Sequence, residues 1–156
     1  MLLAALAGRV FSGAGGSRAA AEDRTAAILE ELWEAHLAIE FDPGQKSTAH
    51  TMATMVETPF VNHVPTLVGG MGQRHLSYFY ERHFIFQNPP MQITPVKRSI
   101  AAPRGGGGSA SIVDEMVVSF MHDTEVDWLL PGVAPTGRNI TFPLVASVDF
   151  AQGEPS

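Results

Sequence analysis

The sequence predicts an α+β domain in which helices pack on one face of a curved, mainly antiparallel sheet that forms a cone. Apolar residues recur every three to four positions between residues 25 and 84, and every second position between residues 91 and 150. Helices followed by strands are typical of this class. With 156 residues, 45% of them hydrophobic, the chain can build one ordinary core and not two. We therefore expect a single domain over residues 23–156.

Residues 1–22 are predicted to lie outside this domain, as a disordered or targeting extension. They contain two arginines and no acidic residue before Glu22, a composition compatible with an organelle transit peptide. No positive charge precedes the apolar stretch 2–7, which argues against a secretory signal. No apolar run reaches the roughly 18 residues that a membrane span needs. A cytoplasmic or organellar protein without a membrane partner is expected.

The first half of the domain is predicted to be mainly helical. An amphipathic helix is expected over residues 25–41, and a shorter one, capped by Ser47, over residues 48–56. A short strand at residues 60–64 and a flexible glycine loop at residues 68–72 precede a third helix over residues 73–84.

The second half is predicted to form three strands, over residues 91–101, 112–124 and 139–150. In an extended chain, alternate side chains share a face. One face is mostly apolar but includes Asp114 and His122, which indicates the lining of a pocket, because buried ionisable groups cost several kcal/mol unless they are paired. Asp127 is expected on the opposite, solvated face, unless a bulge near residues 123–124 turns it inward.

The composition excludes several kinds of function. The formal net charge is −6 and no basic cluster is present, so a nucleic-acid partner is not expected. Without cysteine the chain has no disulfide and no thiolate nucleophile. The glycine loop lacks both the dinucleotide motif and the phosphate-binding lysine, so no cofactor is predicted.

The candidates for acid/base chemistry are histidines and a carboxylate that a cone would bring together. His36, His63 and His122 can move a proton near neutral pH, with Asp114 or Glu40 as a carboxylate helper. Tyr80 is the candidate hydrogen-bond donor. Asp114 and His122 lie roughly 26 Å apart along a strand at about 3.3 Å per residue, so they do not form a dyad. The alternative is that each histidine is a buried, hydrogen-bonded structural residue.

The predicted ligand-binding residues combine aromatic walls with one carboxylate: Trp33, Glu40, Phe120 and Trp128. They would suit a small hydrophobic ligand. His36, Glu40, His63 and His122 have the chemistry of metal ligands, but no local metal-binding motif accompanies them. His36 and Glu40 are more simply explained as a pair four residues apart on a helix, so no metal is predicted.

The order of elements resembles a known superfamily, together with the segment Pro135-Thr136-Gly137-Arg138 before a strand that ends Asp149-Phe150-Ala151-Gln152-Gly153. The chain is similar, over most of residues 25–153, to the SnoaL-like branch of the nuclear-transport-factor-2-like (cystatin-like cone) superfamily. The resemblance implies isomerase or cyclase chemistry on a hydrophobic carbonyl compound, or a non-enzymatic module that forms homodimers or binds other proteins.

Two features bear on this resemblance. Members of the family continue past the position of Gly153 through a closing antiparallel strand, so the domain is expected to be incomplete, with an open sheet edge near Phe150. Such proteins are also often labelled carboxymethylenebutenolidase-related. The chain has no cysteine and no nucleophile-elbow motif, so that label would describe association with a dienelactone hydrolase rather than its chemistry.

Overall fold

The structure is a computed structural model, which describes residues 2–8, 18–101 and 109–152. It confirms the α+β class. The elements are β1 (Leu2–Gly8), α1 (Arg18–Phe41), α2 (Thr48–Ala53), β2 (Phe60–His63), β3 (Val68–Met71), α3 (Gly72–Phe79), a π-helical turn η1 (Tyr80–Phe84), β4 (Gln92–Ala101), β5 (Ala110–Met121) and β6 (Asn139–Gln152). No helix in the described part of the chain is long and apolar enough to cross a membrane.

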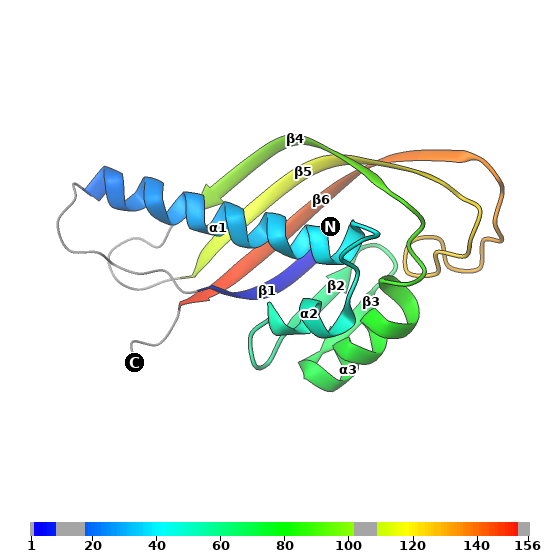
Figure 1. The fold of residues 1–156 in the computed structure, drawn as a ribbon, viewed down its shortest axis with the longest axis horizontal. Coiled ribbons are helices and arrows are strands. Elements are labelled where there is room, and N and C mark those ends of the chain that lie inside the picture. The colour runs from blue at the N-terminus through cyan, green and yellow to red at the C-terminus, as the bar shows by residue number, and fades with distance from the viewer. Residues whose placement is uncertain (1, 9–17, 102–108, 153–156) are drawn as a thin grey trace.

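The strands form one six-stranded sheet in the order β3-β2-β1-β6-β5-β4. Neighbouring strands are antiparallel except β1 and β6, which run parallel. Figure 1 shows long, curved strands β4 to β6 with α1 crossing in front of them, while α2 and α3 lie beside the short strands β2 and β3. The core therefore forms between the helices and one face of the sheet.

Strand β1 lies in a part of the chain that the sequence analysis placed outside the domain. All seven of its residues pair with Ala146–Gln152 of β6, and three of them pair with β2. The expected open edge at Phe150 is wrong, because β6 lies between β1 and β5 and Phe150 is 1% exposed. The sheet therefore includes residues from the segment 1–22.

Strand β5 follows the predicted alternation. Asp114, Met116, Val118 and Phe120 are buried, whereas Glu115 between them is exposed. The strand ends at Met121, before the predicted end at residue 124, so the regular alternation does not extend to Asp127. This early end changes the position of Asp127, as described below.

The glycine loop predicted at residues 68–72 is mostly a strand. Gly69 in β3 has φ +133°, and a Cβ atom there would collide with the backbone oxygen of Val61 on β2. Glycine is therefore required because the two strands approach closely, rather than because the segment is flexible.

Candidate functional site

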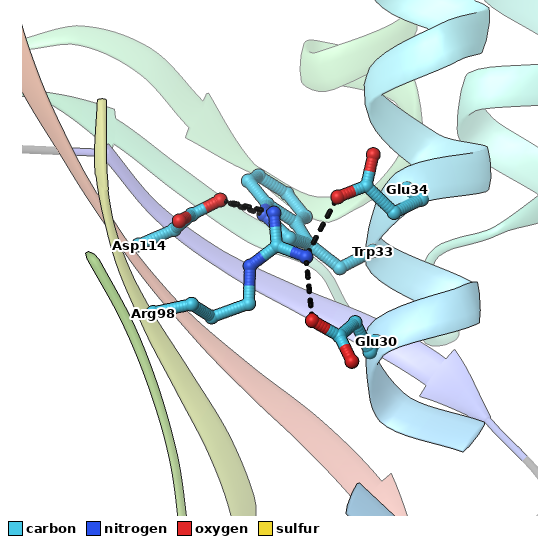
Figure 2. Close-up of polar contacts among 5 residues, drawn as sticks. All are labelled: Glu30, Trp33, Glu34, Arg98 and Asp114. Atoms are coloured by element: carbon cyan, nitrogen blue, oxygen red, sulfur yellow. Dashed lines mark hydrogen bonds and ion pairs between the residues drawn. The ribbon is translucent and has the colours of Figure 1, made fainter. Parts of the chain in front are cut away.

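Asp114 is the centre of a hydrogen-bonded network between the sheet and α1 (Figure 2). Its Oδ2 atom accepts hydrogen bonds from Trp33 Nε1 at 2.7 Å and from Arg98 Nη2 at 2.6 Å. Arg98 Nη1 lies 2.6 Å from Glu34 and 3.3 Å from Glu30, both on α1. Burial alone would lower the pKa of Arg98, but its hydrogen bonds with Asp114 and Glu34 outweigh this effect and raise it. The network connects α1 to β4 and β5.

His36, Glu40 and Tyr80 lie together in the core. His36 Nε2 is 3.0 Å from Glu40 Oε1, and its Nδ1 is 2.7 Å from Thr54 Oγ1. The imidazole stacks on Trp33 with ring centres 5.7 Å apart. Burial, the charge of Glu40 and a hydrogen bond with Glu40 raise the pKa of Tyr80 well above its usual value. The structure therefore joins four of the predicted site residues, but inside packed protein.

His63 is held in an aromatic cluster. Its Nδ1 donates a hydrogen bond to the Val68 carbonyl at 3.1 Å, and its ring lies 4.9 to 5.3 Å from the rings of Phe79, Phe84 and Trp128. Burial lowers the pKa of His63 to about 4. A histidine with this pKa is neutral at pH 7, which suits a structural role.

His122 lies beside Phe120, whereas Trp128, the other remaining predicted wall residue, lies elsewhere. His122 follows β5, its Nδ1 is 3.2 Å from Thr136 Oγ1, and Phe120 packs edge-on against it. Trp128 donates a hydrogen bond from Nε1 to Asn88 Oδ1 at 2.7 Å. Among the described residues, no three His, Asp or Glu side chains gather as a metal ion would require.

The core around Trp33, His63 and Trp128 is almost filled. Between Trp33, His63 and Trp128 a cavity of about 10 Å³ remains, bordered by Met116 and Ala146. A space of this size holds about one water molecule, and small-molecule sites are typically about 300 to 1,000 Å³. Between these three side chains there is therefore no room for a ligand larger than water. A pocket of about 290 Å³ lies beside them, between α1 and strands β4 and β5, and Arg98 and Asp114 line it.

A much larger groove lies outside the core, between β3, α3 and the connection from β5 to β6. Its volume is about 920 Å³, and its lining combines apolar and ionisable side chains: Leu67, Val68, Gly69, Arg74, His75, Tyr78, Phe79, His83, Asp127, Trp128 and Pro131. In it His83 Nδ1 lies 2.9 Å from Asp127 Oδ2, and both side chains are 40% exposed. Neither of these two residues was predicted from the sequence as a site residue.

The π-helical turn places His83 in this groove. The backbone N–H of Ile85 bonds to the Tyr80 carbonyl at 2.9 Å, a spacing of five residues instead of four. In an α-helix, residues five apart point roughly 140° away from each other. Here the extra residue in the turn brings the rings of Tyr78 and His83 to 5.6 Å. A single π-helical turn in an otherwise α-helical segment is frequently found at a functional site.

Asp127 is positioned by the early end of β5. Its backbone N–H donates to Gln87 Oε1 at 3.2 Å, in a turn where the Leu130 N–H bonds to the Val126 carbonyl at 2.8 Å. Extending the strand to residue 128 would have placed Asp127 on the solvated face. The apolar alternation breaks at residues 123–125, and this break is the sequence signal that could have located Asp127. It was interpreted above as the site of a bulge.

The chain matches no family model, no curated protein and no solved structure. What the groove can do chemically is therefore inferred from the positions of its side chains. When His83 Nδ1 carries a proton, it donates to Asp127, and Nε2 is left as a proton acceptor. A carboxylate that orients an imidazole in this way is the arrangement of a general base.

Proposed function

We propose that the chain binds a small, mainly apolar, carbonyl-containing ligand in the groove beside α3, and that His83, oriented by Asp127, transfers a proton to or from it. The observation that carries this proposal is the 2.9 Å contact between these two side chains in the wall of a groove of about 920 Å³. The groove has the volume of a small-molecule site, and the core cavity does not.

The walls of the groove favour an apolar ligand. Trp128 and Phe79 supply buried aromatic surface, and Leu67 and Tyr78 remain 75% and 63% exposed at the groove. Leu67 also has φ +59°, a strained conformation for a leucine. Backbone strain of this kind costs about 1–3 kcal/mol and is concentrated at functional sites. The exposed side chains at the groove are those that a ligand would cover.

This proposal moves the site away from the interior of the cone. His36, His63, His122 and Asp114 each have hydrogen-bond partners within packed protein, which favours structural roles. We retain membership of the SnoaL-like branch as a proposal, supported by the order of the elements. The isomerase or cyclase chemistry that this resemblance implies is compatible with a histidine base.

The proposal is tested by a thermal-shift screen of small aromatic ketones and keto acids on three proteins. Compounds that stabilise the wild type should stabilise His83→Ala less, because the ring of His83 lines the groove. His50→Ala is the matched control, since His50 is exposed on α2 and does not line the groove. If every stabilising compound acts equally on His83→Ala and on the control, the ligand does not occupy this groove.

A second function, homodimerisation, is favoured by the outer face of the sheet. Val113, Met121 and Val145 point away from the core and are 38%, 43% and 37% exposed. Burial of these side chains in a dimer would contribute roughly 25 cal/mol per Å² of apolar surface. Light scattering should then detect a dimer for the wild type and a monomer for Val113→Lys/Val145→Lys. A wild type that is monomeric at high micromolar concentration would contradict this second function.

A further inference from the structure

We propose that the ligand of the groove is an anion, an apolar body with one carboxylate group that binds Arg74. This inference rests on the proposed function and names the class of its ligand. The chain has 16 Asp and Glu side chains against 10 Lys and Arg, whereas the groove lining has one acid and one arginine, together with two histidines. Arg74, His75 and His83 line the groove, and Asp127 is the one acid among the lining residues.

Asp127 does not neutralise Arg74. Its Oδ2 lies 2.9 Å from His83, and the ion pairs of the described residues include none with Arg74. The guanidinium is therefore exposed at the groove without a carboxylate partner from the described part of the chain. Arginine presents a planar set of donors that matches a carboxylate, so this class of ligand fits it best.

The position of Arg74 on α3 strengthens this argument. Helix α3 begins at Gly72, so Arg74 lies in its first turn, where the helix dipole disfavours a cation. The residue before the helix, Met71, supplies no side-chain hydrogen bond to that turn. A bound carboxylate would remove the unfavourable charge arrangement that Arg74 creates. A cationic ligand would add to it.

The geometry of the groove gives the two ends of the ligand different roles. Tyr78 lies four residues after Arg74 on α3, and its ring lies 5.6 Å from that of His83. The apolar body would then cover Tyr78 and Trp128 while its carboxylate contacts Arg74 and its reacting end faces His83. Arg74 is thus a residue that selects the ligand, and His83 is the residue that exchanges the proton.

The test uses two probes of equal shape, 1-naphthylacetate and its neutral amide, measured by calorimetric titration of the full chain. Wild type should bind the carboxylate about tenfold more tightly than the amide, as a charge-assisted hydrogen bond at a partly exposed site provides. Arg74→Gln should remove this preference, because it should weaken binding of the carboxylate about tenfold more than binding of the amide. Arg82→Gln is the matched control, because Arg82 is an exposed arginine that does not line the groove.

The results of this experiment distinguish a failure of the anion proposal from a failure of the proposed function on which it rests. If wild type binds the two probes equally, the proposal that the ligand is an anion is wrong, and the groove remains a site for neutral ligands. Equal loss of the preference in Arg74→Gln and Arg82→Gln would also overturn it, because the effect would come from the overall charge. Binding of neither probe at millimolar concentration would contradict both proposals. A preference that decreases from 50 to 500 mM salt supports the ion pair.

Discussion

At the scale of single residues, Asp114 shows how an ionisable group on an apolar strand can be structural. One of its oxygens accepts from both Trp33 and Arg98, and the residue is 1% exposed. A carboxylate that accepts two strong hydrogen bonds compensates for part of its loss of solvation. Its neighbour on β5, Glu115, has the same charge on the exposed face and needs no such partners.

The first prediction compares these two neighbours. Asp114→Asn keeps the shape but removes the charge that faces Arg98, so we expect the free energy of unfolding to fall by about 1–3 kcal/mol. Glu115→Gln should change it by less than about 0.5 kcal/mol. Urea denaturation of both variants and the wild type measures the difference. Equal effects would mean that the network in Figure 2 contributes nothing to stability.

A second prediction concerns pH. Burial lowers the pKa of His63 to about 4 from its ordinary 6.5, so the unfolded chain binds a proton there more readily than the folded one. His63 therefore costs no stability above pH 6.5, and stability is lost as the pH falls from 6.5 to 4. Near pH 4 the loss from this group approaches about 3 kcal/mol, from 1.36 kcal/mol per pKa unit.

Urea denaturation between pH 4 and 7.5 measures this effect. In His63→Asn the decrease in unfolding free energy over this interval should be smaller than in wild type by about that amount, although the variant is less stable at pH 7.5. His50→Asn, which changes an exposed histidine on α2, should follow the wild-type curve. If His63→Asn and wild type have parallel curves, His63 titrates normally in the folded protein.

At this scale the sequence pattern located three of the buried ionisable groups, but not the partly buried Arg98 and not the pair in the groove. His36, Glu40 and Asp114 fall on apolar faces that simple periodicity locates, and all three are buried. His83 and Asp127 depend on a π-helical turn and on the end of a strand, and these are local departures from regular period. Periodicity assumes a constant number of residues per turn, so it misplaces side chains after such departures.

At the scale of elements, the position of β3 beside β2 depends on one glycine. Any side chain at residue 69 would meet the Val61 carbonyl at a φ of +133°. Gly72, three residues later, also has a positive φ, +80°, but no atom lies within 4 Å of where its Cβ would be. The two glycines thus separate the effect of close approach from that of backbone conformation.

The third prediction uses this contrast. Gly72→Ala should lower the free energy of unfolding by about 1–2 kcal/mol, the cost of a left-handed conformation in an L-residue. Gly69→Ala should cost about 3 kcal/mol or more, because strain and overpacking add. Chemical denaturation measures both, and binding of a groove ligand should weaken in Gly69→Ala, since Gly69 lines the groove. Similar destabilisation of the two variants would contradict the close approach.

At the scale of the whole molecule, the sequence predicted most of the fold. The helix at residues 25–41 and the strands at 91–101, 112–124 and 139–150 correspond to α1, β4, β5 and β6, with boundaries that differ by a few residues except at the start of α1. Strand β1 was not predicted, because Leu2–Gly8 consists of Leu, Ala and Gly and has no alternation. Its role comes from pairing with residues far away in the sequence.

The last prediction tests that role. Removal of residues 2–8 would leave Ala146–Gln152 of β6 without their neighbour on one side. Loss of this ladder should lower the free energy of unfolding by about 3 kcal/mol or more, at about 0.5–1.5 kcal/mol per hydrogen bond. The uncovered strand edge should also cause association that increases with protein concentration. Denaturation and size-exclusion chromatography measure the two effects.

The control is a variant that lacks residues 153–156 and keeps every described element of the sheet. It should unfold and elute like the wild type. An extension that lies outside the domain, as the composition of residues 1–22 suggested, would instead be removable without effect on either measurement. Because β1 separates β6 from β2 and β3, its removal should also disturb the strands beside the groove. Weaker binding of a groove ligand by the variant without residues 2–8 would therefore connect the β1 pairing to the proposed site.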